Sequence, residues 1–182
     1  LVIARSEAVH IQRMIKSVQD GLALLSKEPN VIDALINDQF AKDPGLSDKY
    51  IPERAVYESL KNYIDAVYRI NAKGIVQSRT PWKDRPPADY SKKPGVSAVL
   101  KNHKPFVTDT FKTSSGKDCI SVCYPMFNNE QFAGVLRAVI YIDTFRECLG
   151  DSDIAGGGYA FMLDSQGKVA SHPSTKVIGL DP

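Results

Sequence analysis

The sequence has 182 residues, of which 43% are hydrophobic and 24% are charged, and its formal net charge is +2. This composition is typical of a globular protein, and the length suits one domain with an appendage. The Lys and Arg residues are scattered rather than clustered, which argues against nucleic acid as a partner, and no run of about 18 apolar residues is present to span a bilayer.

The first part of the sequence is predicted to be helical. Apolar residues recur at three- and four-residue steps before Pro29, which indicates a long amphipathic helix. Pro29 ends this helix, Asn30 can cap a second, short one, and Pro52 suits the first turn of a third. The three predicted helices cover residues 1–27, 31–40 and 52–62.

After residue 62 the pattern changes to that of strands. Residues 63–70 and 75–79 are predicted to form a hairpin around the turn from Asn71 to Gly74. Asn71 can bond its own backbone nearby, and Gly74 can adopt a positive φ at the end of the turn. Both residue types therefore have a mechanical reason to be in this turn.

A loop over residues 80–94 and a short helix over residues 95–103 follow the hairpin. Beyond them, alternating apolar residues separated by polar turns predict an antiparallel meander of three strands. These strands cover residues 106–112, 119–127 and 132–142.

The hairpin pattern occurs a second time near the end of the sequence. A short helix over residues 144–149 and a flexible joint at residues 156–158 precede it, and residues 162–172 then repeat the strand, turn and strand. In this copy Asp164 and Gly167 take the turn positions. A repeated hairpin indicates a repeated domain. We therefore predict a helical segment, one complete module and the start of a second, over residues 1–44, 45–150 and 151–182.

This order of elements resembles that of PAS-like sensor modules, and in particular the double Cache family. The matching motifs span residues 60–180 and lie at residues 71–78, 84–86, 104–109, 121–125, 134–136 and 158–173. The resemblance implies an α+β fold, in which a PAS-like antiparallel five-stranded sheet packs against the long N-terminal helix. It also implies that the second PAS-like module is truncated.

The resemblance implies a non-enzymatic sensor domain that binds a small organic ligand and needs no cofactor. Such domains are extracytoplasmic, periplasmic or extracellular, and belong to membrane-anchored histidine kinases, chemoreceptors or related signalling proteins. In them the first module usually holds the ligand, and the long helix continues from a transmembrane segment and supports contacts in a homodimer. The alternative is a structural dimerisation or spacer module of a membrane receptor that binds no ligand.

Arg137 is the main candidate for the ligand site. The strand over residues 132–142 is apolar on both faces except at Arg137, which indicates a central strand covered on both sides. A guanidinium there must be paired, because an isolated buried charge is very costly. Its donors match a carboxylate in two parallel bonds, so Arg137 can anchor an anionic ligand. Alternatively, Arg137 pairs internally, for example with Asp65, or reaches water.

The resemblance also bears on the ligand's chemistry. The amino-acid binders of the family usually place an Asp on this strand to hold the ammonium group of the ligand. When Gly134 and Val135 are aligned with the family pattern, Val139 takes that position. A valine cannot hold an ammonium group, so the resemblance favours a carboxylate ligand without an amine.

Five further residues are candidates for the ligand site. Trp82, Arg85 and Tyr90 resemble the aromatic and Arg residues that line the mouth of such pockets. Asp109 can accept a hydrogen bond from a ligand or orient Arg85, and Tyr141 shares the face of Arg137. Four of them have a plainer interpretation: Trp82 and Tyr141 as core residues, Arg85 and Asp109 as surface charges.

The sequence shows no signature of an enzyme or a metal site. The three histidines are dispersed, and no Cys/His spacing suits zinc. Cys119 and Cys123 lie four residues apart in a predicted strand, about 13 Å between Cα atoms, whereas a disulfide needs less than about 7 Å. A hydrolase that uses Cys119 with His103 is a third possibility, but nothing in the apolar strand would lower the pKa of that thiol.

Overall fold

The computed structural model describes residues 2–37, 51–81, 88–113, 115–149, 161–163, 165–172, 174 and 176. Its helices are α1 (Val2–Leu25), α2 (Pro29–Ile36), α5 (Ile51–Leu60), α6 (Pro94–Asn102) and α7 (Ile142–Leu149). Its strands are β1 (Ile64–Asn71), β2 (Val76–Thr80), β3 (Phe106–Val107), β4 (Phe111–Lys112), β5 (Asp118–Asn128), β6 (Gln131–Tyr141), β7 (Met162–Leu163) and β8 (Val169–Ser171). None of the helices in these ranges is long and apolar enough to cross a membrane.

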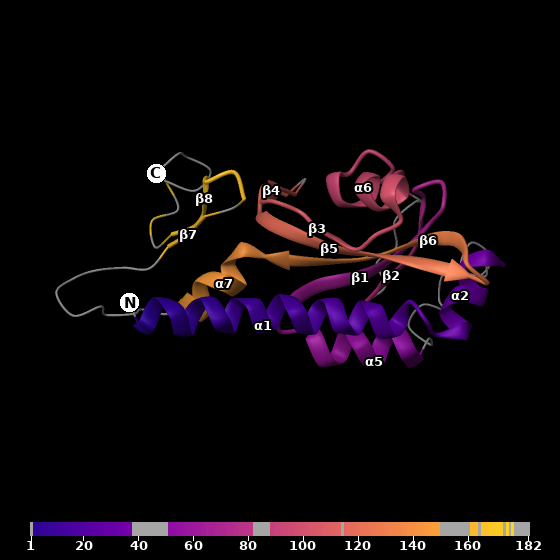
Figure 1. Cartoon of the computed structure of the whole chain (residues 1–182), viewed down its shortest axis with the longest axis horizontal. Helices are drawn as coiled ribbons and strands as arrows, with labels where there is room; N and C mark the ends of the chain where they lie inside the picture. The colour runs from indigo at the N-terminus through magenta and orange to yellow at the C-terminus, as the bar shows by residue number, and fades with distance from the viewer. Residues whose placement is uncertain are drawn as a thin grey trace.

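The predicted N-terminal helix is confirmed as α1, which runs along one face of the sheet (Figure 1). Its apolar stripe is buried against β5 and β6, at Ile11, Met14, Val18, Leu22 and Leu25. Helices α2 and α5 pack on the same side of the sheet. The main hydrophobic core therefore lies between these helices and one face of the sheet.

The cap predicted for the second helix is wrong by two residues. Helix α2 starts at Pro29, with Glu28 in the N-cap position and no side-chain cap bond. The reason is that proline at the first helical position already has a suitable φ and lacks the N–H that would go unbonded there. Pro29 therefore begins the second helix instead of only separating it from the first.

Within the described residues, the main sheet has six strands in the order β2-β1-β6-β5-β3, with β4 also pairing with β5, and every pairing is antiparallel. The antiparallel sheet and the central place of β6 were predicted correctly, but the number of strands was not. The predicted strand over residues 106–112 is divided into β3 and β4. Between them the side-chain hydroxyl of Thr108 accepts the Ser121 N–H at 2.8 Å, a side-chain bond in place of a backbone one.

The turn of the first hairpin has the geometry predicted for it. Asn71 Oδ1 accepts the backbone N–H groups of Lys73 and Ile75, both at 3.0 Å. Gly74 has a φ of +84°, and Gly167 in the turn between β7 and β8 has a φ of +82°. Since side chains other than that of glycine are strained there, the two glycines allow the tight turns.

Helix α6 covers part of the opposite face of the sheet (Figure 1). Its buried residues Val96 and Val99 pack on Ile70, Cys123 and Val135. A Cβ on Gly95 would be only 2.7 Å from the sulfur of Cys123. The absence of a side chain at Gly95 therefore allows the helix to lie this close to the sheet. This second, smaller core stops beside Arg137, the next residue of β6 on the same face.

Candidate functional site

Arg137 is held at the centre of the sheet inside a cage of aromatic rings. It is 6% exposed, and its Nε donates to Ser121 Oγ at 3.0 Å on the neighbouring strand β5. The guanidinium carbon lies over three rings, with centroid distances of 5.5 Å to Tyr68, 5.3 Å to Tyr90 and 5.7 Å to Phe111. Such cation–π contacts offset part of the cost of burying the charge.

No carboxylate of the described residues forms an ion pair with Arg137. Asp65, the internal partner considered above, is bound instead by Arg79, at 2.8 Å between Nη2 and Oδ2. Arg79 also donates to the Tyr68 hydroxyl at 3.3 Å and to the Pro81 carbonyl at 2.6 Å. The charge of Arg79 is thus neutralised, whereas the two terminal nitrogens of Arg137 have no hydrogen bond to the described part of the protein.

Tyr141 lies on the same strand and face as Arg137, toward Asp65. Burial raises the pKa of Tyr141 to about 12, and the nearby Asp65 carboxylate contributes to the rise. The ammonium group of Lys117 lies 4.8 Å from the centroid of the Tyr141 ring. At neutral pH the Tyr141 hydroxyl is therefore protonated, and Asp65 is its hydrogen-bond partner.

Of the other predicted site residues, Tyr90 is beside Arg137, whereas Asp109 is directed elsewhere. Asp109 Oδ1 accepts from the Ser165 hydroxyl at 2.5 Å, and Oδ2 accepts from Gln166 Nε2 at 3.4 Å. These bonds, above all the one from Ser165, lower the pKa of Asp109. Trp82 and Arg85 lie outside the described residues.

Sequence reasoning missed four residues that surround Arg137 or fix its neighbours. Tyr68 lies directly opposite Arg137 in the register between β1 and β6, and Arg79 lies opposite Tyr68 on β2. Ser121 and Phe111 are supplied by β5 and β4. The sequence shows these residues in strands, but the register that brings them together becomes visible only in the folded sheet.

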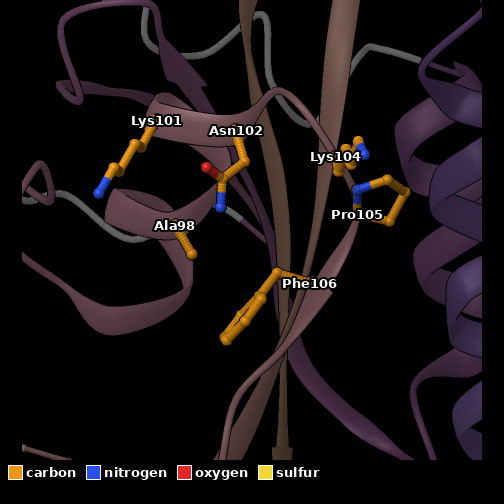
Figure 2. Close-up of a pocket in the computed structure, with 6 residues that line it drawn as sticks. All are labelled: Ala98, Lys101, Asn102, Lys104, Pro105 and Phe106. Atoms are coloured by element: carbon orange, nitrogen blue, oxygen red, sulfur yellow. The ribbon is translucent and has the colours of Figure 1, made fainter.

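A separate surface hollow lies between the end of α6 and β3 (Figure 2). Figure 2 shows the Phe106 ring beside α6, with Lys101 and Asn102 at the end of that helix. The hollow is lined by Ala98, Lys101, Asn102, Lys104, Pro105 and Phe106. It contains none of the predicted site residues and no buried polar group, so it is a weaker candidate than the surroundings of Arg137.

Burial makes the thiols of β5 poor nucleophiles. Burial raises the pKa of Cys119 to about 11 and that of Cys123 to about 12, and outweighs the opposing effect of Arg137. Two pKa units above the ordinary value of 9.0 mean roughly 100-fold less thiolate at pH 8. The thiolate is the reactive form, so the structure argues against catalysis by Cys119.

We therefore expect no reaction of Cys119 or Cys123 with a chromogenic disulfide reagent at pH 8 in folded protein. The variant Cys148→Ser leaves these two as the only cysteines, and the released thiolate can be followed by absorbance. The same protein in guanidinium chloride should react completely within minutes. Reactivity of the folded protein should rise only above about pH 10, and fast labelling at pH 8 would contradict the buried environment.

An antiparallel sheet with a long helix packed on one face has the architecture of a PAS-like module. The family model of the Cache domain, dCache_1, matches residues 2–180. The chain belongs to this family, as its sequence motifs predicted.

One curated relative is the methyl-accepting chemotaxis protein PscA of Pseudomonas syringae pv. tomato. It is 30% identical over 95 residues, which are 50% of this chain and 15% of that protein. The chain thus spans only a small part of this relative.

Several solved structures share the fold at low sequence identity. The sensor domain of the Vibrio cholerae histidine kinase DctB has a TM-score of 0.73 at 15% identity, over 97% of this chain and 66% of that one. An extracellular ligand-binding receptor from Desulfohalobium retbaense has a TM-score of 0.70 at 16% identity, over 98% of this chain and 32% of that one. The ligand-binding domain of the Pseudomonas fluorescens chemoreceptor CtaA, in complex with L-serine, has a TM-score of 0.64 at 20% identity, over 98% of this chain and 70% of that one.

Proposed function

We propose that this chain is an extracytoplasmic sensor domain that binds a small organic carboxylate at Arg137 and passes the signal to a membrane-anchored signalling protein. Membership of the Cache family and the likeness to a chemotaxis protein support the sensor role. The observation that carries the ligand site is the guanidinium of Arg137, which is buried but has no carboxylate partner among the described residues. A ligand carboxylate would supply that partner.

The surroundings of Arg137 suit a carboxylate with a small apolar body. With Nε engaged by Ser121, its two terminal nitrogens remain for the carboxylate oxygens. The rings of Tyr68, Tyr90 and Phe111 would contact the rest of the ligand. Apolar walls with a few convergent donors are typical of small-molecule sites.

Amino acids are the competing class of ligand. Related chemoreceptor domains have been solved with L-serine, L-glutamine and GABA, all of which contain a carboxylate. An amine, however, needs an anionic partner, and Val139 stands on the same face as Arg137 where such a residue was expected. The nearby carboxylate of Asp65 is already paired with Arg79. The structure therefore supports a carboxylate without an amine.

A thermal-shift screen tests this proposal. The probes are propionate, pyruvate, succinate and benzoate, with L-serine, L-glutamine and GABA as the amine-containing set. A carboxylate at 100 times its Kd adds about 2.7 kcal/mol of stability, which raises the Tm of a protein of this size by roughly 5–10 °C. Stabilisation by amino acids alone would contradict the argument from Val139.

The alternative is a structural module without a ligand, for which the absence of any thermal shift would be the expected result. The surroundings of Arg137 favour the sensor, because no carboxylate of the described residues pairs with its guanidinium. A homodimer through α1 is compatible with either function. In support of it, α1 carries an exposed apolar side chain at Val9, which is 42% exposed.

A further inference from the structure

Asp109 lies between the surroundings of Arg137 and the β7–β8 hairpin, where the second module is predicted to begin. Its carboxylate accepts three hydrogen bonds from the turn of this hairpin. Oδ1 accepts from the Ser165 N–H at 3.3 Å and from the Ser165 hydroxyl at 2.5 Å, and Oδ2 accepts from Gln166 Nε2 at 3.4 Å. One side chain thus joins segments that are far apart in the sequence, and Figure 1 shows the hairpin beyond the β4 end of the sheet.

The residue before Asp109 is tied to the partner of Arg137. The Thr108 N–H donates to the Ser121 carbonyl at 2.9 Å, and the Ser121 N–H donates to Thr108 Oγ1 at 2.8 Å. Ser121 Oγ in turn accepts the Nε of Arg137 at 3.0 Å. Both Thr108 and Ser121 are buried, at 7% and 1% exposure, so neither can move independently of the other.

The segment after Asp109 also touches Arg137. Two residues further along the chain, the Phe111 ring lies 5.7 Å from the guanidinium carbon. Any rotation of the guanidinium toward a ligand must change its bond to Ser121 or its stacking on Phe111. Asp109 is positioned between these two contacts, in the break that divides β3 from β4.

We propose that Asp109 is a positioning residue that couples the state of Arg137 to the β7–β8 hairpin. Movement of Arg137 would shift the segment from Thr108 to Phe111 and so strengthen or weaken the bonds of Asp109 to Ser165 and Gln166. The direction of signalling, from ligand to second module, rests on the function proposed above. The mechanical coupling does not, since it depends only on contacts within the protein.

Spatial continuity alone does not establish coupling, so the test is a double-mutant cycle. Hydrogen exchange of the backbone amides of residues 165–171 is measured in wild type, Ser121→Ala, Asp109→Asn and the double variant, without ligand. Ser121→Ala removes the hydroxyl that holds Arg137 and should change hairpin exchange at least threefold. In the Asp109→Asn background the same substitution should have no further effect.

The matched control is Asp118→Asn, because Asp118 is another carboxylate of the same sheet and is paired with Lys112 instead of the hairpin. Ser121→Ala should keep its full effect on the hairpin in this background. The amides of α1 report global stability and should exchange alike in all variants. As a second perturbation, Arg137→Lys removes the bond to Ser121 but keeps the charge.

Two results would overturn the proposal: unchanged hairpin exchange in Ser121→Ala and Arg137→Lys, or an equal change with and without Asp109. An effect on the α1 amides as large as that on the hairpin would also count against it, since the perturbation would then be global. Because no ligand is present, the outcome is separate from the carboxylate screen. Either proposal can fail while the other stands.

Discussion

The substitution Glu53→Ala is expected to lower the free energy of unfolding by about 3–5 kcal/mol, because it removes the carboxylate from a fully buried ion pair. Arg69 has a side-chain exposure of 0%, and its Nε lies 3.1 Å from Glu53 Oε1. Arg69 also donates to the Val31 carbonyl at 3.2 Å and to Ser78 Oγ at 3.1 Å. These neutral groups satisfy donors but supply no negative charge.

The same ion pair connects the helices with the sheet. Glu53 comes from α5, Val31 from α2 and Ser78 from β2, and all three contact Arg69 on β1. Burial raises the pKa of Glu53, and Arg69 opposes this by lowering it. Since the intact pair includes such a large desolvation cost, its net contribution is small, and most of the expected loss comes from breaking it.

Urea unfolding followed by circular dichroism would measure the effect of Glu53→Ala. The double variant Glu53→Ala/Arg69→Met should recover much of the lost stability, because it removes both charges. The control is Glu58→Ala on the same helix, whose ion pair with Lys61 is solvent-exposed. That variant should change stability far less than Glu53→Ala does, because solvent screens an exposed ion pair. If Glu53→Ala lowered stability as little as Glu58→Ala does, the buried-pair interpretation would be contradicted.

The local structure could be predicted because it depends on local patterns. The stripe of α1 follows from residue spacing, and the turns at Asn71 and Gly74 follow from what these side chains can do. The central place of β6 followed from its apolar residues on both faces. In each instance the physical cause lies within one element of the chain.

The features that were missed depend on contacts between distant elements. The division of the predicted third strand depends on the Thr108 hydroxyl meeting the backbone of Ser121. The two arginines of the first hairpin, Arg69 and Arg79, are paired on opposite faces of the sheet with Glu53 and Asp65. Strand register and helix packing decide such pairs, and neither is encoded in a local sequence pattern.

Arg137 was predicted in part from a local pattern, while its contacts depend on distant elements. Its position as a lone charge in an apolar strand was sufficient to single it out, because a buried cation requires compensation. That compensation comes from a serine and three aromatic rings. The positions of Ser121, Tyr68 and Phe111 around Arg137 depend on the pairing of different strands. The sequence also suggested Asp65 as a partner of Arg137, but in the structure Asp65 forms its ion pair with Arg79.

The substitution Arg137→Ala is expected to weaken carboxylate binding by about 2–5 kcal/mol, because the ligand's charge would be buried without a partner. This corresponds to a roughly 30- to 4,000-fold increase in Kd. Stability without ligand should change far less, since no protein carboxylate of the described residues is left unpaired by the substitution. Calorimetric titration with the most stabilising carboxylate of the screen would give the affinity, and thermal unfolding the stability.

Arg79→Ala is the matched control, since both arginines are stacked on the Tyr68 ring, at 5.6 Å and 5.5 Å. The substitution removes the partner of Asp65, so it should lower stability more than Arg137→Ala does. The terminal nitrogens of Arg79 are already hydrogen-bonded in the protein, so Arg79 is not expected to bind the ligand. The two variants should therefore show opposite patterns, with Arg137→Ala losing mainly affinity and Arg79→Ala losing mainly stability. If Arg137→Ala bound the carboxylate as wild type does, the ligand would have to occupy another part of the chain.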